Sequence, residues 1–216
     1  MTSFSTKKLI QIFFKAPIEG QVKTRLIPKV GLSNSVIIHT RLCEQVIQCV
    51  AEYAGKNEDV AVQFWVDLDV SHTFVQEHAK RYGIDVFQQQ GSDLGERMQS
   101  AMQSGLMVAD QVVIVGGDCF SLCGEYLAQA FDVLDNKDMV FGPADDGGYI
   151  LIGSHGLESG FFKNVQWGES TVLASTIECA HQSGQTYGLL EERWDIDTWE
   201  DIQRNAPQLL EGLERL

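Results

Sequence analysis

Short apolar runs alternate along the chain with longer segments of helical periodicity. Seven of the runs are rich in β-branched and aromatic residues, and several are continuously apolar. Continuous apolar runs are typical of strands that are buried on both faces of a sheet. The pattern therefore predicts strands at residues 9–15, 59–66, 84–88, 111–115, 139–142, 149–153 and 186–190.

The clearest helical segment covers residues 33–54. Its apolar residues, among them Leu42, Val46 and Val50, recur at helical spacing, and Ser33 is a candidate cap at its start. Alternating strands and helices predict a single-domain, three-layer α/β fold over residues 1–216, with a mainly parallel sheet. The two neighbouring strands after residue 138 interrupt the alternation. Further helices are predicted at residues 71–82, 94–107, 124–134 and 169–183, and from Trp199 to the C-terminus.

Charge is distributed unevenly along this acidic chain. The net charge is -14, yet residues 1–29 hold six basic residues and one acid, a local balance of +5. An acidic protein is repelled by nucleic acid and by anionic membranes, so neither is an expected partner. The basic segment suits a small anion, and a nucleotide phosphate fits that description.

Two features bear on the compartment of the protein. The apolar run at residues 9–14 is far too short to span a membrane. The five cysteines are odd in number and contain no C-x-x-C pair, so we expect reduced thiols rather than a zinc site. Together these features predict a cytoplasmic protein without a membrane span. The oligomeric state is left open.

The basic segment includes "KAPIEGQVKTRL", residues 15–26, directly after the first predicted strand. It is neither a Walker A loop nor a G-x-G-x-x-G loop. Lysine and arginine spaced as in "KTR" can nevertheless reach one polyphosphate, Lys23 as a mobile point charge and Arg25 as a forked donor. A solvated basic loop is the alternative.

Acidic residues follow other predicted strands. Asp118 in "GGDCFSL" ends a buried apolar strand, where a charge is costly unless it is compensated, so it is a candidate ligand for a divalent cation. A helix N-cap is its alternative role. In "GPADDGGYILIG", Gly147 and Gly148 can form a hairpin turn, but such a turn does not require the two acids before it.

The segment "WDIDTWEDI", residues 194–202, has two interpretations. Asp197 or Thr198, followed by two acids, makes a sensible helix start. If the segment returns to the strand ends, Asp195 or Asp197 can instead face Asp118 across one metal ion. The sequence alone leaves both possibilities open.

Taken together, these motifs resemble the nucleotide-diphospho-sugar transferase superfamily, and specifically its bacterial DUF2064 group of glycosyltransferase-like proteins. The resemblance runs in family order from residue 15 to residue 202. It is carried by "KAPIEGQVKTRL", "SDLGERM", "GGDCFSL", "GPADDGGYILIG", "QWGESTVL" and "DIDTWEDI". One departure is Phe120, where the family usually has proline, and this changes the backbone restraint beside Asp118.

The resemblance implies a GT-A type, Rossmann-like fold and a set of site residues. Lys15, Lys23 and Arg25 would bind the nucleotide phosphates. Asp118 and Asp197 would hold Mg²⁺ or Mn²⁺. The expected catalytic residues are Asp118 and Asp146, and the residues expected to contact substrate are Glu96, Arg97, Gly147, Gly148, Tyr149 and Trp167.

The function implied is a metal-dependent glycosyltransferase with a nucleotide-diphospho-sugar donor and a small-molecule acceptor. The "KTRL" element also resembles the "K-S-R-L" of 2-phospholactate guanylyltransferases. The first alternative is therefore a nucleotidyltransferase that uses a nucleoside triphosphate and releases pyrophosphate. A nucleotide-binding regulator without catalysis is the second alternative.

Overall fold

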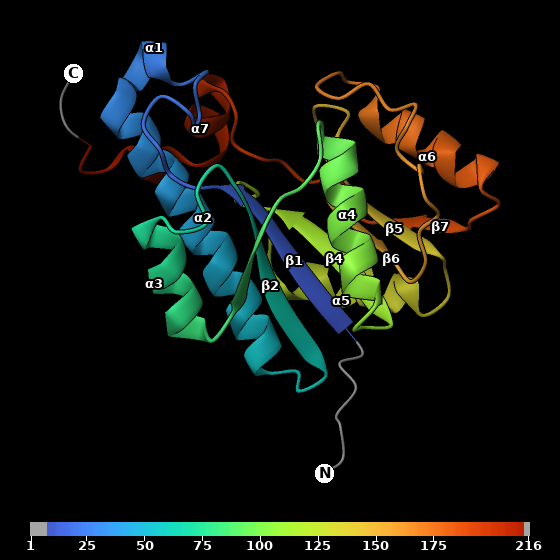
Figure 1. Ribbon diagram of the computed structural model, residues 1–216. Coiled ribbons are helices and arrows are strands. Elements are labelled where there is room, and N and C mark those ends of the chain that lie inside the picture. Colours follow the sequence, from blue (N-terminus) through green and yellow to red (C-terminus); the bar gives the residue numbers. More distant parts are fainter. Residues whose placement is uncertain (1–7, 214–216) are drawn as a thin grey trace.

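The computed structural model describes residues 8–213, which form a seven-stranded mixed sheet between two layers of helices (Figure 1). The strand order is β3-β2-β1-β4-β6-β5-β7. The strands are β1 (Lys8–Lys15), β2 (Val60–Asp67), β3 (Asp85–Gln88), β4 (Gln111–Gly116), β5 (Met139–Pro143), β6 (Tyr149–Ser154) and β7 (Tyr187–Leu189). The predicted α/β fold with a mainly parallel sheet is confirmed.

The strand directions bring distant segments to one edge of the sheet. Parallel pairing joins β1 to β2 and β4, β2 to β3, and β5 to β7. Among the described strands, only β6 is antiparallel to its neighbours β4 and β5. The consecutive strands β5 and β6 form the hairpin that interrupts the predicted alternation. The first residues of β6 therefore lie at the same edge as the carboxyl ends of the parallel strands, where ligands bind in open α/β sheets.

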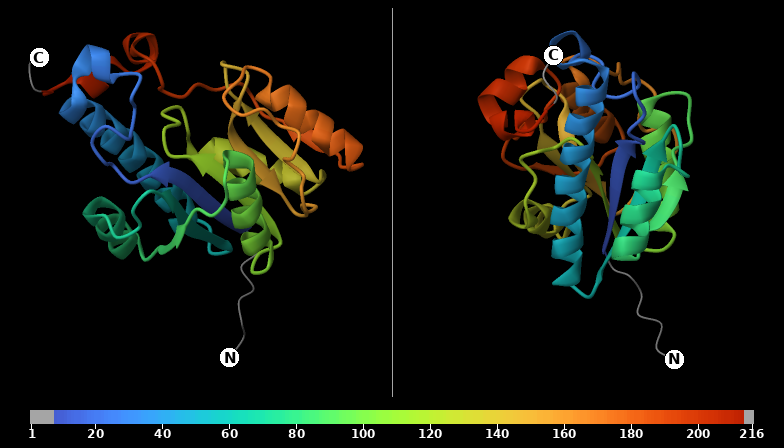
Figure 2. Two further views of the ribbon diagram at one scale, coloured as in Figure 1. Left: turned by 45° about the horizontal axis from the view of Figure 1, so that its top comes forward. Right: turned by 90° about the vertical axis from the view of Figure 1, so that its left-hand side faces the viewer.

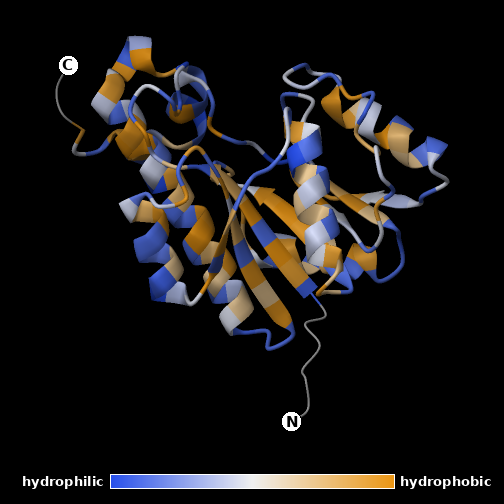
Figure 3. Ribbon diagram, viewed as in Figure 1, coloured by the Kyte–Doolittle hydropathy of each residue, from blue (hydrophilic) through white to orange (hydrophobic). Residues whose placement is uncertain are grey.

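Each face of the sheet is covered by its own helices. One hydrophobic core joins the sheet to α2 (Leu32–Gly55), α3 (Thr73–Tyr82) and α5 (Gly124–Leu134). A second core joins the opposite face to α4 (Leu94–Leu106) and α6 (Val172–Gln182). Hydrophobic residues run along the strands between these layers, as Figure 3 shows.

A third, smaller core ties the C-terminal segment to the start of the chain. It packs α7 (Trp199–Asn205) and the 3₁₀ turn η1 (Pro207–Leu210) against α1 (Ile27–Val30) and the first turns of α2. The Arg41 guanidinium on α2 donates to the Leu209 carbonyl at 2.7 Å and to the Glu211 carbonyl at 2.9 Å. The two views of Figure 2 show α7 beside this end of α2.

Two local predictions were wrong. Ser33 does not cap α2, because the helix begins one residue earlier and the Ser33 hydroxyl donates to Glu19 instead. The last helix does not run to the C-terminus but ends at Asn205, since proline at 207 disfavours helical geometry in the residue before it. The end of that prediction, residues 214–216, lies outside the described residues.

None of the helices of residues 8–213 is both long and apolar enough to cross a membrane. All five cysteines carry free thiols.

Candidate active site

A cleft of about 760 Å³ runs along the carboxyl edge of the sheet. The loop after β1, the ends of β2 and β3, and α4 form its first half. The start of β6 and the loop before α6 form its second half, and residues that follow β4 and β7 form its floor. Most of the predicted site residues line this cleft, namely Lys15, Lys23, Arg25, Arg97, Asp118, Asp146, Gly148, Tyr149, Trp167 and Asp197.

Lys23 extends from the loop after β1 to the acids of the floor and is almost completely buried, with 5% of its side chain exposed. Its ammonium donates to Asp118 Oδ2 at 2.9 Å and to Asp197 Oδ1 at 2.7 Å. Burial opposes a charged ammonium, but the two carboxylates outweigh it and raise the pKa of Lys23. The backbone of Lys23 is left-handed, with φ 44°, which is strained for a residue with a side chain. The loop therefore holds this ammonium against the acids rather than leaving it mobile in solvent.

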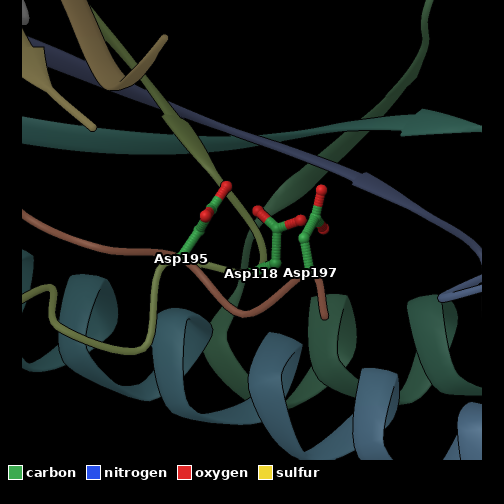
Figure 4. A group of neighbouring side chains, drawn as sticks. All are labelled: Asp118, Asp195 and Asp197. Carbon is green, nitrogen blue, oxygen red and sulfur yellow. The ribbon is translucent and has the colours of Figure 1, made fainter. Parts of the chain in front are cut away.

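Asp195 joins Asp118 and Asp197 in one cluster of carboxylates (Figure 4). An oxygen from each of the three lies within 4.8 Å of an oxygen from each of the others. Burial and the neighbouring Asp118 and Asp197 raise the pKa of Asp195 to about 7, whereas the Lys23 ammonium overcomes the effect of burial and lowers the pKa of Asp118. Carboxylate oxygens at this spacing are the ligands that Mg²⁺ and Mn²⁺ prefer, so the donor set fits such an ion.

Arg25 supports the cluster from outside. Its guanidinium contacts Asp197 Oδ2 at 3.3 Å, and its side chain is 68% exposed. The next residue, Leu26, is fully buried in the third core, which also contains Ile196. The third core thus brings the loop after β1 close to the segment that carries Asp195 and Asp197, although the two are far apart in sequence.

The second half of the cleft combines one carboxylate with aromatic side chains. Asp146 Oδ1 accepts a hydrogen bond of 2.8 Å from the Gly148 amide, which fixes the orientation of this exposed carboxylate. Tyr149 and Trp167 pack edge to face with their ring centroids 6.5 Å apart. Glu169 lines the same wall. This half can therefore present an apolar ring surface and acceptors of hydrogen bonds to a bound molecule.

On the opposite wall, an ion pair connects α4 to the end of β2. Arg97 Nη1 lies 2.8 Å from Asp67 Oδ2, and Arg97 Nε donates to the Gly91 carbonyl at 3.2 Å. Gln89, which follows β3, lines the cleft beside them. Sequence reasoning did not select Asp67, Gln89 or Glu169, although Asp67 and Gln89 stand at or just beyond predicted strand ends, a signal that was available.

The chain is similar to known proteins in family and in fold, although no protein with curated annotation matches it. A family model described as "Uncharacterized protein conserved in bacteria (DUF2064)" matches residues 50–169, more than half of the chain. The chain belongs to the DUF2064 family. The resemblance stated from the motifs is confirmed.

Solved structures share the fold of this DUF2064 protein. A Desulfovibrio desulfuricans protein provisionally described as a nucleotide-diphospho-sugar transferase is 27% identical, with a TM-score of 0.79 over 94% of this chain and 93% of that one. The 4-diphosphocytidyl-2C-methyl-D-erythritol synthase of Anaerococcus prevotii is 9% identical, with a TM-score of 0.58 over 94% and 98%. A cytidylyltransferase from Leptospira borgpetersenii is 18% identical, with a TM-score of 0.56 over 98% and 99%. The last two likenesses concern the fold alone.

Two of the residues expected to contact substrate, Glu96 and Gly147, lie outside the cleft lining. Glu96 is exposed on α4, where its carboxylate accepts from the Ser92 amide and hydroxyl at 2.8 Å each, so its contacts stabilise the helix start. Gly147 packs instead against the chain before α6, and its carbonyl accepts from the Leu173 amide at 3.0 Å. A Cβ on Gly147 would overlap the Ser170 carbonyl oxygen. The "D-G-G-Y" and "QWGESTVL" motifs are thus parts of one packed unit.

The structure shows which helix-start roles the acidic motifs have. Asp118 is not an N-cap, because α5 begins at Gly124 after Cys123. The helix-start interpretation of "WDIDTWEDI" is correct for Thr198 and Asp201, which form a capping box at α7. The same segment also places Asp195 and Asp197 beside Asp118, and a metal ion shared by these acids stays a prediction. Phe120 does not displace Asp118 from the cluster, and its carbonyl accepts from Gln45 at 2.7 Å.

The close packing of Gly147 leads to a prediction for stability. Gly147→Ala is expected to lower the free energy of unfolding by more than about 2 kcal/mol, because φ is 89° and the new methyl group meets backbone. Gly168→Ala is a matched control, since φ there is 84° but a Cβ meets nothing within 4 Å. It should cost only about 1 kcal/mol. Urea denaturation measures both values, and equal losses would contradict the packing argument.

Proposed function

We propose that this DUF2064 protein is a metal-dependent glycosyltransferase that uses a nucleotide-diphospho-sugar donor and an acceptor without phosphate or carboxylate groups. The family, the fold and the 27% identical protein described as a nucleotide-diphospho-sugar transferase support a transferase that uses nucleotides. The choice of sugar as the transferred group depends on the charges in the cleft.

The division of charge between the two halves of the cleft is the observation that carries the proposal. The lysine and arginine side chains that line it all belong to the first half, namely Lys15 at the end of β1, Lys23 and Arg25 in the loop after β1, and Arg97 on α4. Among the described residues that line the second half, the charged side chains are the carboxylates of Asp146 and Glu169. A diphosphate suits the first half, and an acceptor in the second half meets carboxylates and aromatic rings. An anionic acceptor would be repelled there.

In the proposed reaction, Lys23 and Arg25 donate hydrogen bonds to the diphosphate of the donor and stabilise the charge that develops as it leaves. The free Asp146 oxygen accepts the proton of an acceptor hydroxyl, while the Gly148 amide holds the other oxygen. The acceptor oxygen then bonds to the anomeric carbon as the bond from that carbon to the phosphate oxygen breaks. The products are the glycosylated acceptor, a nucleoside diphosphate and the proton on Asp146.

The aromatic residues Tyr149 and Trp167 provide a surface against which a sugar ring can pack while water is excluded. Asp118, Asp195 and Asp197 are the residues that would hold Mg²⁺ or Mn²⁺. An ion bound there would offset the negative charge on the leaving diphosphate.

Nucleotidyl transfer is the second candidate function. It is favoured by the pairing of Lys23 with the acid cluster, because the same groups can stabilise pyrophosphate that leaves a nucleoside triphosphate. When the acceptor is a phosphorylated acid, its own phosphate or carboxylate is the nucleophile that attacks the nucleoside triphosphate. The carboxylates of the second half disfavour such an acceptor.

A screen of ligands separates the two functions. With Mn²⁺ present, one of a panel of nucleotide-diphospho-sugars is expected to raise the melting temperature more than any nucleoside triphosphate, since a ligand stabilises according to its occupancy of the native state. The best binder should also release nucleoside diphosphate and free sugar slowly without acceptor. If a triphosphate stabilises most, and pyrophosphate is formed when phosphorylated acids are added, the nucleotidyltransferase replaces the glycosyltransferase.

A further inference from the structure

The position of Lys23 has a consequence for the order in which ligands enter the site. Its ammonium lies between Asp118 and Asp197, at 2.9 and 2.7 Å from one oxygen of each. The side chain is 5% exposed and the loop that carries it is anchored by the buried Leu26. These are the contacts of a cation that is held in place, not of a side chain extended toward solvent.

The same two carboxylates belong to the set that fits a divalent cation. Such an ion binds carboxylate oxygens at roughly 2.0–2.2 Å, and an ion shared by Asp118 and Asp197 would therefore lie in the space now filled by Lys23 Nζ. Two positive charges cannot occupy this space together. The lysine and the metal ion compete for the same oxygens.

We propose that Lys23 and the divalent cation are alternative partners of Asp118 and Asp197, and that the diphosphate of the bound nucleotide drives the exchange between them. Before nucleotide binds, Lys23 holds the acids together. When the nucleotide enters, its diphosphate becomes the partner of Lys23, and the cation takes over the carboxylates. The part played by the diphosphate rests on the proposed function.

Burial explains why the exchange needs an anion. The Lys23 side chain is 5% exposed, so an ammonium that leaves its two carboxylates must find another negative partner, or its desolvation is uncompensated. A diphosphate provides that partner. The cation and the nucleotide should therefore strengthen each other's binding, and thermodynamic linkage requires the two effects to be equal.

The test measures binding of Mn²⁺ alone to the protein without nucleotide, from the electron paramagnetic resonance signal of free Mn²⁺. Removal of the competing charge in Lys23→Met should tighten Mn²⁺ binding at least tenfold relative to wild type. Arg25→Met is the matched control, since it also removes one positive charge near Asp197 but from an exposed side chain at 3.3 Å. Its effect should be smaller than threefold.

Further variants locate the effect and protect the test from misfolding. Asp118→Asn added to Lys23→Met should remove the gain in Mn²⁺ affinity, because it deletes a ligand. Circular dichroism checks folding, and Lys23→Gln replaces Lys23→Met if the latter unfolds. A gain no larger than that of Arg25→Met would overturn the proposal.

Failure of the proposed function would be recognised separately. A wild-type protein that binds neither nucleoside diphosphates nor nucleotide-diphospho-sugars would refute that function. Competition between Lys23 and the metal ion is judged from Mn²⁺ alone and does not depend on that result.

Discussion

Replacing Asp146 with asparagine is expected to lower kcat for sugar transfer by about 10²- to 10⁴-fold, the range for loss of a general base. The amide keeps the shape of the side chain and its contact with the Gly148 amide but cannot accept the proton of the acceptor hydroxyl. Donor affinity should change little, since the basic residues that line the cleft lie in its other half. Steady-state kinetics of nucleoside diphosphate release, together with calorimetric titration of the donor, measures both quantities.

Asp145 provides the control for this substitution. It is the adjacent acid, it is exposed, and it is not part of the cleft lining. Asp145→Asn should therefore leave kcat within about threefold of wild type, as expected for an exposed charge that does not line the cleft. Equal losses in the two variants would mean that Asp146 acts through the general charge of the loop and not as a base.

The second large effect is expected at the acid cluster. Asp118→Asn and Asp197→Asn should each weaken Mn²⁺-dependent binding of the donor by about 1.5–3 kcal/mol, the range for hydrogen bonds to charged groups, since the two side chains are 37% and 41% exposed. Because both carboxylates contact the Lys23 ammonium and would share one ion, the double variant should lose little more than the worse single variant. Calorimetric titration with and without Mn²⁺ gives the three binding energies.

Glu200→Gln is the control for these substitutions. Glu200 is an exposed acid in the first turn of α7, three residues from Asp197. Its replacement should not alter donor affinity. Strictly additive losses for Asp118 and Asp197 would show independent roles and would argue against a shared ion.

Much of the fold could be predicted because its signals are local. The apolar run of β4 predicted a strand at residues 111–115, and the structure extends it by one residue to Gly116. Because ligands bind at the carboxyl ends of strands, the position of Asp118 just after β4 predicted a site residue, and Asp118 does line the cleft. Strand periodicity and end position were sufficient for this part of the site.

Other features depend on contacts between distant residues and leave no local signal. Lys23 has the sequence environment of a solvated loop, yet its side chain is buried against Asp118 and Asp197, and the core that contains both Leu26 and Ile196 is a long-range contact that periodicity does not report. Gly147 was expected to contact substrate, yet its close neighbour is the Ser170 backbone, 23 positions later. Glu96 was expected to contact substrate because it belongs to a family motif, whereas its carboxylate accepts hydrogen bonds from Ser92 at the start of α4.

The C-terminal segment that closes the acid cluster also has a consequence for synthesis of the protein. Lys23 and Asp197 are separated by 174 positions, and the third core that brings them together requires α7. A nascent chain that has emerged only as far as β7 already contains every strand of the sheet but lacks Asp195 and Asp197. Such a chain can fold its sheet while the cluster of Asp118, Asp195 and Asp197 is still incomplete. The carboxylates of Asp118, Asp195 and Asp197 therefore come together only after the segment that follows β7 has been synthesised, whereas the strands of the sheet precede that segment.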